Sequence, residues 1–354
     1  METIFSTLKI NLFDAHLIQQ HLLPWYDKNR RVLPWRALPG HKPNVYHVWL
    51  SEIMLQQTTV PTVIPYFLNF IRLWPTVHAL SEASLDDILH AWQGLGYYAR
   101  ARNLFKCAQE IATLYKGDFP SSESTLLTLP GIGPYTAAAI AAIAFEKNTS
   151  PLDGNIERVL SRVYAIDTPL PTSKSLLKNL ARHHTPFQRL GDYAQALMDL
   201  GSLVCTPKNP TCFVCPLKDF CRAFQKGKAE IYPLKEEASL KPTRTLDAFW
   251  IESKSGALLL EKRPHKGLLG GLVMVPIPYL NKNEENLFFK EEALPLKGVV
   301  SHTFTHFHLK VRVLKSFIER DNLSLLENQF WCPLAKISEQ ALPTLMKKIM
   351  RHVL

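Results

Sequence analysis

The sequence has 354 residues, 46% of them hydrophobic and 20% charged, which is enough chain for two domains that each bury a core. Lysine and arginine total 41 against 31 acidic residues, a formal net charge of +10, and this excess indicates a polyanionic partner, with nucleic acid as the first candidate. The most apolar stretch, residues 136–145, is too short to cross a bilayer, and the first twenty residues do not look like a secretory signal. We therefore expect no membrane span and a soluble intracellular protein.

Hydrophobic periodicity divides the chain into two parts. Up to about residue 225 apolar residues recur at helical spacing, as in residues 156–163 and 197–204, where they share one helix face. Residues 226–245 are charged, contain prolines and have no sustained apolar period, which is typical of a linker. The sequence thus predicts an all-α first domain over residues 1–225 and a linker over 226–245.

The rest of the chain, residues 246–354, has the alternation typical of strands. Residues 246–264 predict two strands around a turn at 253–256, and residues 298–314 predict a further strand. The predicted fold class is therefore multi-domain, with an all-α domain followed by an α+β domain.

Glu52 is the first candidate catalytic residue along the chain, in the stretch VWLSEIMLQQT. Helical spacing places it beside Val48, Trp49 and Leu55, so its carboxyl can lie against apolar surface. Burial of this kind raises a carboxyl pKa and provides a proton donor near neutral pH. A solvated helix glutamate is the alternative and, for a glutamate considered alone, the more common case.

Residues 127–145, LTLPGIGPYTAAAIAAIAF, place a Pro-Gly-x-Gly turn between two helical segments, the second beginning near Pro134. Gly131 and Gly133 allow the backbone to approach another group closely, and the helix N-terminus behind them suits a DNA phosphate. A tight connection between two helices is the alternative. The following alanine-rich helix favours a helix-hairpin-helix motif that binds DNA.

Asp153 and Asn155 precede an expected helix over residues 156–163, with a glycine between them. Both residue types commonly cap helices, and capping is the simpler interpretation of each. A helix N-terminus also favours an ionised carboxylate, so Asp153 could stay anionic while Glu52 stays protonated. Two carboxyls with different pKa values are the groups that glycosidic bond cleavage requires.

The stretch CTPKNPTCFVCPLKDFC, residues 205–221, is called the four-cysteine loop below. Disulfides are rare in a reducing compartment, so such a group favours metal or redox chemistry over four unrelated structural thiols. The spacing fits zinc poorly because only one CxxC pair is present, and it differs from the common ferredoxin patterns. Three prolines restrict the loop, so its thiolates can converge on one centre. The predicted ligands are Cys205, Cys212, Cys215 and Cys221.

The four-cysteine loop, together with LPGIGPYTAAA, WLSEIMLQQT, WQGLGYYARARNL and LDGNIERVLSR, resembles the iron-sulfur branch of the helix-hairpin-helix DNA glycosylases. Within that branch the sequence is most similar to the MutY-type adenine DNA glycosylases, densely over residues 20–225 and more loosely beyond. The resemblance implies that the four cysteines bind a 4Fe-4S cluster. The cluster would fix a loop whose basic residues, such as Lys208 and Lys218, meet DNA.

The resemblance also implies catalytic roles. Glu52 would be the general acid that protonates adenine, and Asp153 would stabilise the positively charged sugar before water adds. Tyr135 and Asn155 match residues that support the catalytic carboxylate. Relatives that also cut the strand carry a lysine at the position of Tyr135, and its amine forms a Schiff base, which tyrosine cannot do. We therefore expect a monofunctional glycosylase.

Contacts to DNA follow from the same resemblance. Gln57 and Tyr97 match residues that fill or wedge the duplex at the mispair, although core packing is an alternative for Tyr97. Arg36 and Gln195 match the adenine pocket. The target base must leave the stack, at a cost of a few kcal/mol that a weak mispair reduces.

The C-terminal domain resembles a Nudix fold that reads the opposite base. It lacks the Nudix hydrolase signature, so we expect no nucleotide hydrolysis. In HTFTHFH, residues 302–308, the matching positions for contacts to 8-oxoguanine are Phe304, Thr305 and His306, with Thr305 in place of the more usual serine. A metal site built from the three histidines of this stretch is the weaker alternative.

The function predicted from the sequence is base excision repair by a monofunctional adenine glycosylase acting on adenine opposite 8-oxoguanine or guanine. We expect a monomer acting on double-stranded DNA in the cytoplasm, with a 4Fe-4S cluster and no membrane partner. Three alternatives stay open at this point: a related glycosylase for mispaired thymine or an oxidised pyrimidine, a non-enzymatic iron-sulfur DNA-binding protein, and a zinc-bound interaction module.

Overall fold

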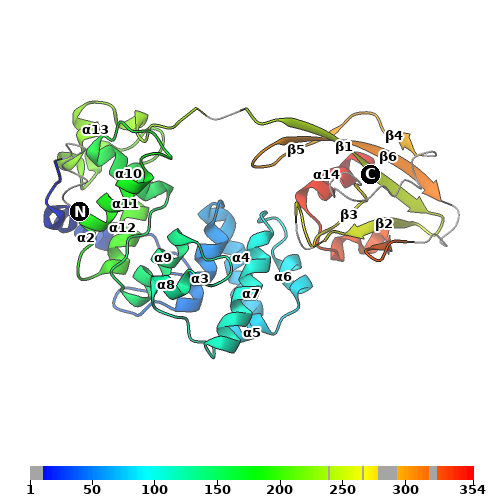
Figure 1. The fold of residues 1–354 in the computed structure, drawn as a ribbon, viewed down its shortest axis with the longest axis horizontal. Helices are drawn as coiled ribbons and strands as arrows, with labels where there is room; N and C mark the ends of the chain where they lie inside the picture. Colours follow the sequence, from blue (N-terminus) through cyan, green and yellow to red (C-terminus); the bar gives the residue numbers. More distant parts are fainter. Residues whose placement is uncertain (1–10, 238–239, 265–266, 278–292, 319–324) are drawn as a thin grey trace. The chain divides into compact units, whose positions relative to one another are not determined.

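The computed structural model of the chain, drawn in Figure 1, describes residues 11–237, 240–264, 267–277, 293–318 and 325–354. The described residues form two compact units. Unit 1 takes its residues from Met1–Ser81 and Lys106–Ala238, and unit 2 from Glu82–Phe105 and Ser239–Leu354. In the described chain no helix is both long and apolar enough to cross a bilayer.

Unit 1 is helical, as the periodicity predicts. Its elements are α2 (Ala15–Asn29), α3 (Val45–Leu55), α4 (Val60–Leu73), α5 (Val77–Ser81), α8 (Glu123–Leu126), α9 (Pro134–Phe145), α10 (Gly154–Tyr164), α11 (Lys174–His184), α12 (Leu190–Leu203) and α13 (Arg222–Gln225), with short 3-10 turns η1 (Cys212–Val214), η2 (Lys218–Phe220) and η3 (Ala229–Ile231). Helix α7 (Ala99–Leu114) begins in unit 2 and ends in unit 1.

Helix α9 is the centre of unit 1. Residues 136–143 are buried without interruption, and most of them are alanine, a strong helix former whose small side chain lets neighbouring helices approach closely. Helices α3, α8 and α12 pack against α9. Because α3 carries Glu52 and α12 carries Gln195, this packing fixes the two predicted site residues within one unit.

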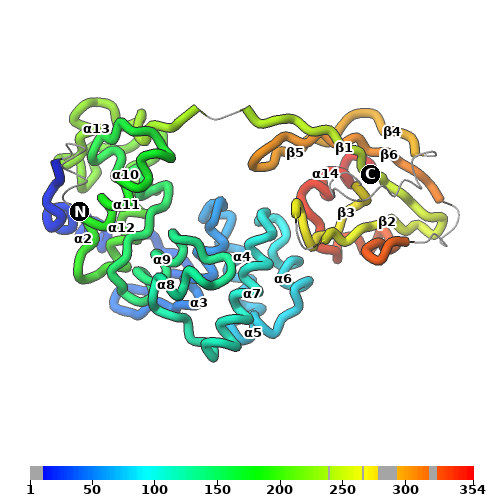
Figure 2. Tube along the Cα trace, in the orientation of Figure 1, coloured from blue at the N-terminus to red at the C-terminus, as the bar shows by residue number. Residues whose placement is uncertain are grey.

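Helices α10 and α12 lie side by side (Figure 2). A Cβ atom added at Gly201 of α12 would lie 2.6 Å from the Cβ of Asn155, near the start of α10. Glycine at 201 therefore allows the close approach that positions Asn155 and, next to it, Asp153.

Unit 2 contains a mixed sheet, which confirms the predicted α+β class. Its strands are β1 (Thr243–Ser253), β2 (Ala257–Lys262), β3 (Val273–Met274), β4 (Leu294–Pro295), β5 (Val300–Thr303), β6 (His308–Ile318) and β7 (Gln329–Pro333). The order is β3-β2-β1-β6-β4, with β5 paired to β6 and β7 paired to β2. Strands β1 and β6 run parallel, from Thr243 opposite His308 to Ser253 opposite Ile318, and the other pairs are antiparallel.

The sheet is covered by α14 (Thr344–Val353), which buries Leu345, Met346 and Ile349 in the same apolar core as β1, β2, β5 and β6. The 3-10 turn η5 (Leu334–Glu339) and helix α6 (Leu85–Ala91) also belong to this unit. Strand β1 begins inside residues 226–245, and residues 82–105 cluster with the C-terminal part of the chain. The predicted domain boundaries at 225 and 246 remain predictions.

The single strand predicted over residues 298–314 is wrong in one respect. The stretch forms two strands, β5 and β6, which pair as a hairpin. The backbone N–H of Phe304 donates to the carbonyl of Phe307 at 2.9 Å, which closes a turn between them. Thr305 and His306 therefore lie in this turn rather than at alternating positions on a strand.

Candidate active site

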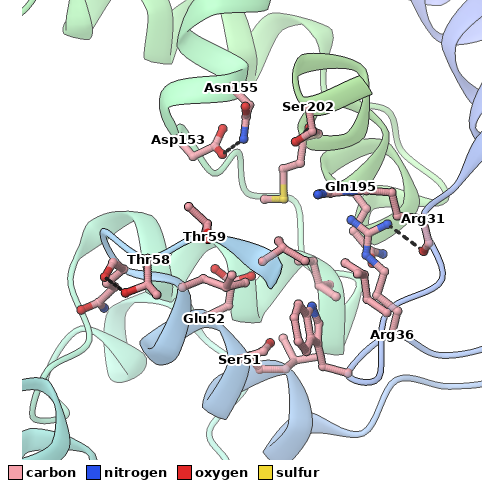
Figure 3. Close-up of a pocket in the computed structure, with 18 of the residues that line it drawn as sticks. Arg31, Arg36, Ser51, Glu52, Thr58, Thr59, Asp153, Asn155, Gln195 and Ser202 are labelled. Carbon is pink, nitrogen blue, oxygen red and sulfur yellow. Dashed lines mark hydrogen bonds between the residues drawn. The ribbon is translucent and has the colours of Figure 1, made fainter. Parts of the chain in front are cut away.

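A pocket of about 620 Å³ lies in unit 1 between α3, the chain before and after it, the N-termini of α9 and α10, and α12. Seven of the residues predicted from the sequence line it: Arg36, Glu52, Gln57, Tyr135, Asp153, Asn155 and Gln195. Figure 3 shows Glu52 on one wall, Asp153 and Asn155 facing it from another element, and Arg31 and Arg36 at one side. The structure thus brings together residues that are far apart in the sequence.

Glu52 is buried in this wall, with 6% of its surface exposed. Burial among apolar neighbours raises the pKa of its carboxyl to about 7, while a hydrogen bond from Tyr135 and the charge of Arg36 oppose that rise. One carboxyl oxygen, Oε2, has no hydrogen-bond partner among the described residues. The solvated alternative is therefore wrong, and Glu52 is a buried acid that can hold a proton near neutral pH.

Tyr135 follows Pro134 at the start of α9 and hydrogen-bonds to the carboxyl of Glu52. Burial, and then the neighbouring carboxyl of Glu52, raise the pKa of its phenol well above the ordinary value. The side chain is therefore a neutral hydrogen-bond donor. It cannot supply the amine that a Schiff base requires.

Asp153 is the N-cap of α10. Its Oδ1 accepts from the backbone N–H of Ile156 at 2.8 Å, and its Oδ2 accepts from Nδ2 of Asn155 at 2.8 Å. Burial raises the pKa of Asp153 above its ordinary value, and these hydrogen bonds work against that rise. Both carboxyls of the pocket are thus shifted upward. The predicted effect of the helix N-terminus, which favours the ionised carboxylate, is therefore smaller than the opposing effect of burial on the pKa of Asp153.

Asn155 is held in turn by Arg158, one helical turn further along α10. Arg158 donates from Nη2 to Oδ1 of Asn155 at 2.8 Å and to the carbonyl of Gly201 at 2.6 Å, and from Nε to the carbonyl of Cys205 at 2.7 Å. A chain of hydrogen bonds therefore connects the four-cysteine loop with Asp153. Arg158 was not predicted from the sequence, although its position three residues after Asn155 on a helix was a usable signal.

Arg36 is oriented by Asp199, which was also not predicted from the sequence. Its Nη1 and Nη2 donate to the two carboxylate oxygens of Asp199 at 2.6 and 2.8 Å. Burial raises the pKa of Asp199, but hydrogen bonds and charge from Arg36 and Arg31 outweigh that effect and lower it overall. Gln195, one turn before Asp199 on α12, donates to the carbonyl of Gly191 at 3.1 Å. An aspartate between Met198 and Leu200, inside the apolar stretch 196–200 of α12, was the available signal.

Gln57 and Tyr97, the two predicted duplex-contacting residues, both have a left-handed backbone, with φ of 56° and 47°. Positive φ is uncommon outside glycine and tends to occur at functional sites. Gln57 lines the pocket of unit 1, whereas Tyr97 belongs to unit 2 and is 50% exposed. The neighbouring Tyr98 is buried, so core packing applies to that residue and not to Tyr97.

The predicted mispair residues Phe304, Thr305 and His306 also belong to unit 2, so they do not line the pocket of unit 1. The hydroxyl of Thr305 lies 3.1 Å from that of Tyr97 within unit 2. Both are thus parts of one surface, in a turn and a loop where side chains can reach a ligand.

The predicted hairpin is present between α8 and α9. Gly131 has φ of 78°, a conformation that glycine adopts readily, and Gly133 is the N-cap of α9 with φ of −90°. Only Gly131 therefore needs to be glycine for its backbone angle. A Cβ added at Gly133 would meet nothing within 4 Å, so the space beside it is open.

The four cysteines lie in one loop built from η1, η2 and the start of α13. Burial raises the pKa of the Cys215 thiol to about 12, and the charges of the other three thiols act on it in the same direction, so the four lie near one another. Within the described ranges, no three histidine, cysteine or acidic side chains are arranged around a point that a single metal ion could occupy. Four cysteine thiolates are the ligands that hold iron-sulfur clusters, so the donor set has the chemistry that such a cluster requires.

Arg162 supports the loop from α10. Its side chain, on a residue that is 2% exposed, donates to Sγ of Cys205 at 3.3 Å and to the carbonyl of Thr206 at 2.8 Å. The guanidinium thus donates to both a sulfur and a backbone carbonyl of the four-cysteine loop and holds the loop against α10.

The sequence matches two family descriptions. Residues 50–183 match the HhH-GPD superfamily base excision DNA repair protein family, and residues 247–352 match the NUDIX domain. An adenine DNA glycosylase of Buchnera aphidicola subsp. Acyrthosiphon pisum is 36% identical, covering 95% of this chain and 97% of that protein. Adenine DNA glycosylases of Mus musculus and Homo sapiens are 35% and 34% identical, covering 96% and 93% of this chain and 78% and 72% of theirs.

Two solved structures are similar to the helical part. A thermostable thymine-DNA glycosylase aligns with a TM-score of 0.54 and 27% identity, over 60% of this chain and 97% of that chain. Endonuclease III in a non-covalent DNA complex aligns with a TM-score of 0.50 and 21% identity, over 61% of this chain and 99% of that chain, a likeness that concerns the fold.

Proposed function

The chain belongs to the family of adenine DNA glycosylases, the base excision repair enzymes that hydrolyse the bond between adenine and its sugar, and from this premise we propose that it is monofunctional and acts on adenine opposite 8-oxoguanine or guanine. One observation carries the proposal. Glu52, with a pKa of about 7 and an oxygen without a hydrogen-bond partner in the described chain, faces Asp153 across a pocket that can accept a base.

The first step assigned to these residues is protonation of the base. An adenine rotated out of the duplex enters the pocket, and Glu52 transfers its proton to a ring nitrogen. The bond between that base and the sugar then breaks with its electron pair moving to the base. Free neutral adenine leaves, and Glu52 is left as the carboxylate.

The second step is stabilisation of the sugar. Loss of the base leaves positive charge on the sugar, and the carboxylate of Asp153 lies in the same pocket to offset it. Asn155 and the backbone of Ile156 hold the Asp153 carboxylate in place. Water then adds to the sugar, its proton returns to a carboxylate, and an abasic site with an intact strand remains. The neutral phenol of Tyr135 gives no route to strand cleavage.

We assign Cys205, Cys212, Cys215 and Cys221 to a 4Fe-4S cluster, which when bound would hold the loop rigid and supply redox chemistry at that site. The four neighbouring thiols and the guanidinium of Arg162 support this assignment. We expect a brown protein with about four irons per chain. Cys215→Ser should lose the colour and the iron, whereas Cys332→Ser should keep both. A colourless protein that holds zinc would contradict it.

We assign the reading of the opposite base to Phe304, Thr305 and His306 of unit 2, in a chain that acts as a monomer on double-stranded DNA. Their position in a turn, and the contact between Thr305 and Tyr97, support this role. Thr305→Val should lower the preference for 8-oxoguanine over guanine, while Thr303→Val, on the neighbouring strand β5, should leave it unchanged. Equal losses on both substrates in Thr305→Val would contradict the assignment.

The decisive experiment is single-turnover base release from duplexes with adenine opposite 8-oxoguanine, guanine or thymine, and with thymine opposite guanine. Adenine release from the first two alone, lost in Glu52→Gln and Asp153→Asn and leaving an uncut abasic strand, is expected. Release of thymine would favour the mismatch glycosylase. No release from any duplex would favour a non-enzymatic DNA-binding protein.

A further inference from the structure

Asp199 is a fully buried carboxylate that lies behind the wall of the pocket. It is 0% exposed and sits on α12, a helix whose neighbouring residues are almost all apolar and buried. Two arginines bind it. Arg36 donates to both carboxylate oxygens, and Arg31 donates from its backbone N–H at 3.0 Å and from Nε at 2.5 Å.

The same contacts lock the two arginines to each other. Nη1 of Arg36 also donates to the carbonyl of Arg31 at 3.3 Å, and the backbone N–H of Arg31 donates to Asp199, so the segment before α3 is held together and tied to α12 through Asp199. The Arg36 side chain is 6% exposed and that of Arg31 is 22% exposed. Bidentate pairing fixes the plane of a guanidinium as well as its position.

Both arginines line the pocket that contains Glu52 and Gln195, whereas Asp199 does not reach its surface. In this group one carboxylate faces two guanidiniums, so the group as a whole carries one net positive charge beside the pocket. Guanidinium N–H groups meet the acceptor atoms of a base edge. Gln195 is one turn before Asp199 on the same helix. Helix α12 therefore fixes the position of the Gln195 amide directly and the positions of the two arginines through Asp199.

We propose that Asp199 is a positioning residue for base recognition: it holds Arg31 and Arg36 in the pocket wall as donors to a base edge that carries acceptors, and it limits the positive charge that Glu52 faces. This inference rests on the proposed function, because it assumes that a base enters this pocket. Asp199 acts through the arginines and touches neither the base nor the sugar.

A purely structural anchor would make the same hydrogen bonds, so the charge effect on Glu52 separates the two roles. Tyr135 from α9, Asp153 from the start of α10 and Arg36 from the segment before α3 act on Glu52 directly, whereas Asp199 acts through Arg36, whose charge it offsets. Arg36 lowers the pKa of Glu52. Removing the negative charge of Asp199 should therefore lower that pKa further, so that Glu52 loses its proton at a lower pH.

The test compares Asp199→Asn with wild type in single-turnover release of adenine opposite 8-oxoguanine, across pH, with duplex affinity and thermal unfolding measured beside it. The expected result is a 10- to 100-fold lower rate of adenine release and little change in duplex affinity. The part of the rate profile that falls with rising pH, called the high-pH limb, should move to lower pH. Asp192→Asn is the matched control, since Asp192 is on the same helix and pairs with Arg189 at the surface. It should leave the rate and the pH limb unchanged.

An unchanged rate and pH limb in folded Asp199→Asn, with wild type active, would overturn the inference alone. A wild-type protein that releases no adenine would instead overturn the proposed function and this inference with it. If Asp199→Asn does not fold, Asp199→Glu decides, because it keeps the charge but moves it by one methylene. A rate reduced at least 10-fold with unchanged melting supports positioning, and a wild-type rate overturns it.

Discussion

Arg158 donates from Nη2 to Oδ1 of Asn155 at 2.8 Å, and so fixes the amide whose other end donates to Asp153. The same guanidinium reaches the carbonyl of Cys205 at 2.7 Å. The proposed cluster loop and the proposed sugar-stabilising carboxylate are therefore two ends of one hydrogen-bonded path. Disturbing the loop should change the orientation of Asp153 without any direct contact between them.

Arg158→Gln is the variant that breaks this path. Hydrogen bonds to charged groups each contribute about 1.5–3 kcal/mol, so we expect base release about 10- to 100-fold slower because Asn155 and Asp153 lose their fixed geometry. The iron content should also fall, since the carbonyl of Cys205 loses its donor. Single-turnover kinetics and iron analysis on the same preparation measure both.

Lys174→Gln is the control for Arg158→Gln, because it removes a positive charge whose partner, Glu157, is on the same helix as Arg158. Nζ of Lys174 lies 3.6 Å from Oε1 of Glu157, and the Lys174 side chain is 60% exposed. Loss of this ion pair should therefore change neither the rate of base release nor the iron content. Wild-type base release by Arg158→Gln would show that the path carries no influence on Asp153.

Tyr135→Phe tests the hydrogen bond to Glu52. That bond lowers the pKa of Glu52, so its loss should raise the pKa above about 7. Because Glu52 acts in its protonated form, the limb of the rate profile that falls with rising pH should move to higher pH. The rate below the limb should drop, since the carboxyl is less well oriented. A limb that moves to lower pH in single-turnover profiles would contradict this arrangement.

The raised pKa of Glu52 also predicts how stability depends on pH. In the unfolded chain Glu52 ionises near its ordinary value of 4.5, whereas in the folded protein it ionises near 7. Its contribution to the free energy of unfolding is therefore fully present below about pH 4.5 and is lost as the pH rises through about 7. The size of this contribution is on the order of 3 kcal/mol.

Glu52→Gln removes this ionisation. Relative to wild type, the variant should gain stability between pH 5 and pH 8, measured as the difference in melting temperature at each pH. Glu237→Gln, at an exposed position, is the control. Its difference in melting temperature from wild type should be the same at pH 5 and at pH 8. An equal difference for Glu52→Gln at pH 5 and pH 8 would mean that the folded carboxyl is not buried as observed.

Much of the site could be predicted because its residues stand in local patterns. Helical spacing put Glu52 on an apolar face, and the sequence before α10 placed Asp153 at a helix start; both positions are confirmed. The hairpin around Gly131 was equally visible, since a glycine turn and a proline mark it. These features depend on neighbours within about one helical turn.

The parts that could not be predicted depend on contacts between distant residues. Arg31 and Asp199 are 168 positions apart, and only the packing of α12 behind the pocket brings them together. The turn between β5 and β6 was missed because it contains no glycine or proline; its one local signal is that Thr305 and His306 are consecutive polar residues, so the alternation changes phase between Phe304 and Phe307. The grouping of residues 82–105 with unit 2 likewise rests on tertiary contacts, as between Gln93 and Gln340.

The hairpin glycines allow stability and DNA binding to be separated. Gly131 has φ of 78°, so Gly131→Ala should lower the free energy of unfolding by about 1–2 kcal/mol through backbone strain.

Gly133 has φ of −90° and open space around it, so Gly133→Ala should lower the free energy of unfolding by less than about 1 kcal/mol, the scale of a changed N-cap. A phosphate bound at the N-terminus of α9 would nevertheless occupy the open space beside Gly133, where the added methyl would meet it. Gly133→Ala should therefore bind duplex DNA about tenfold more weakly, as one anion contact at a helix N-terminus is lost. Denaturant unfolding and duplex titration measure the two effects, and wild-type affinity in Gly133→Ala would place the DNA backbone elsewhere.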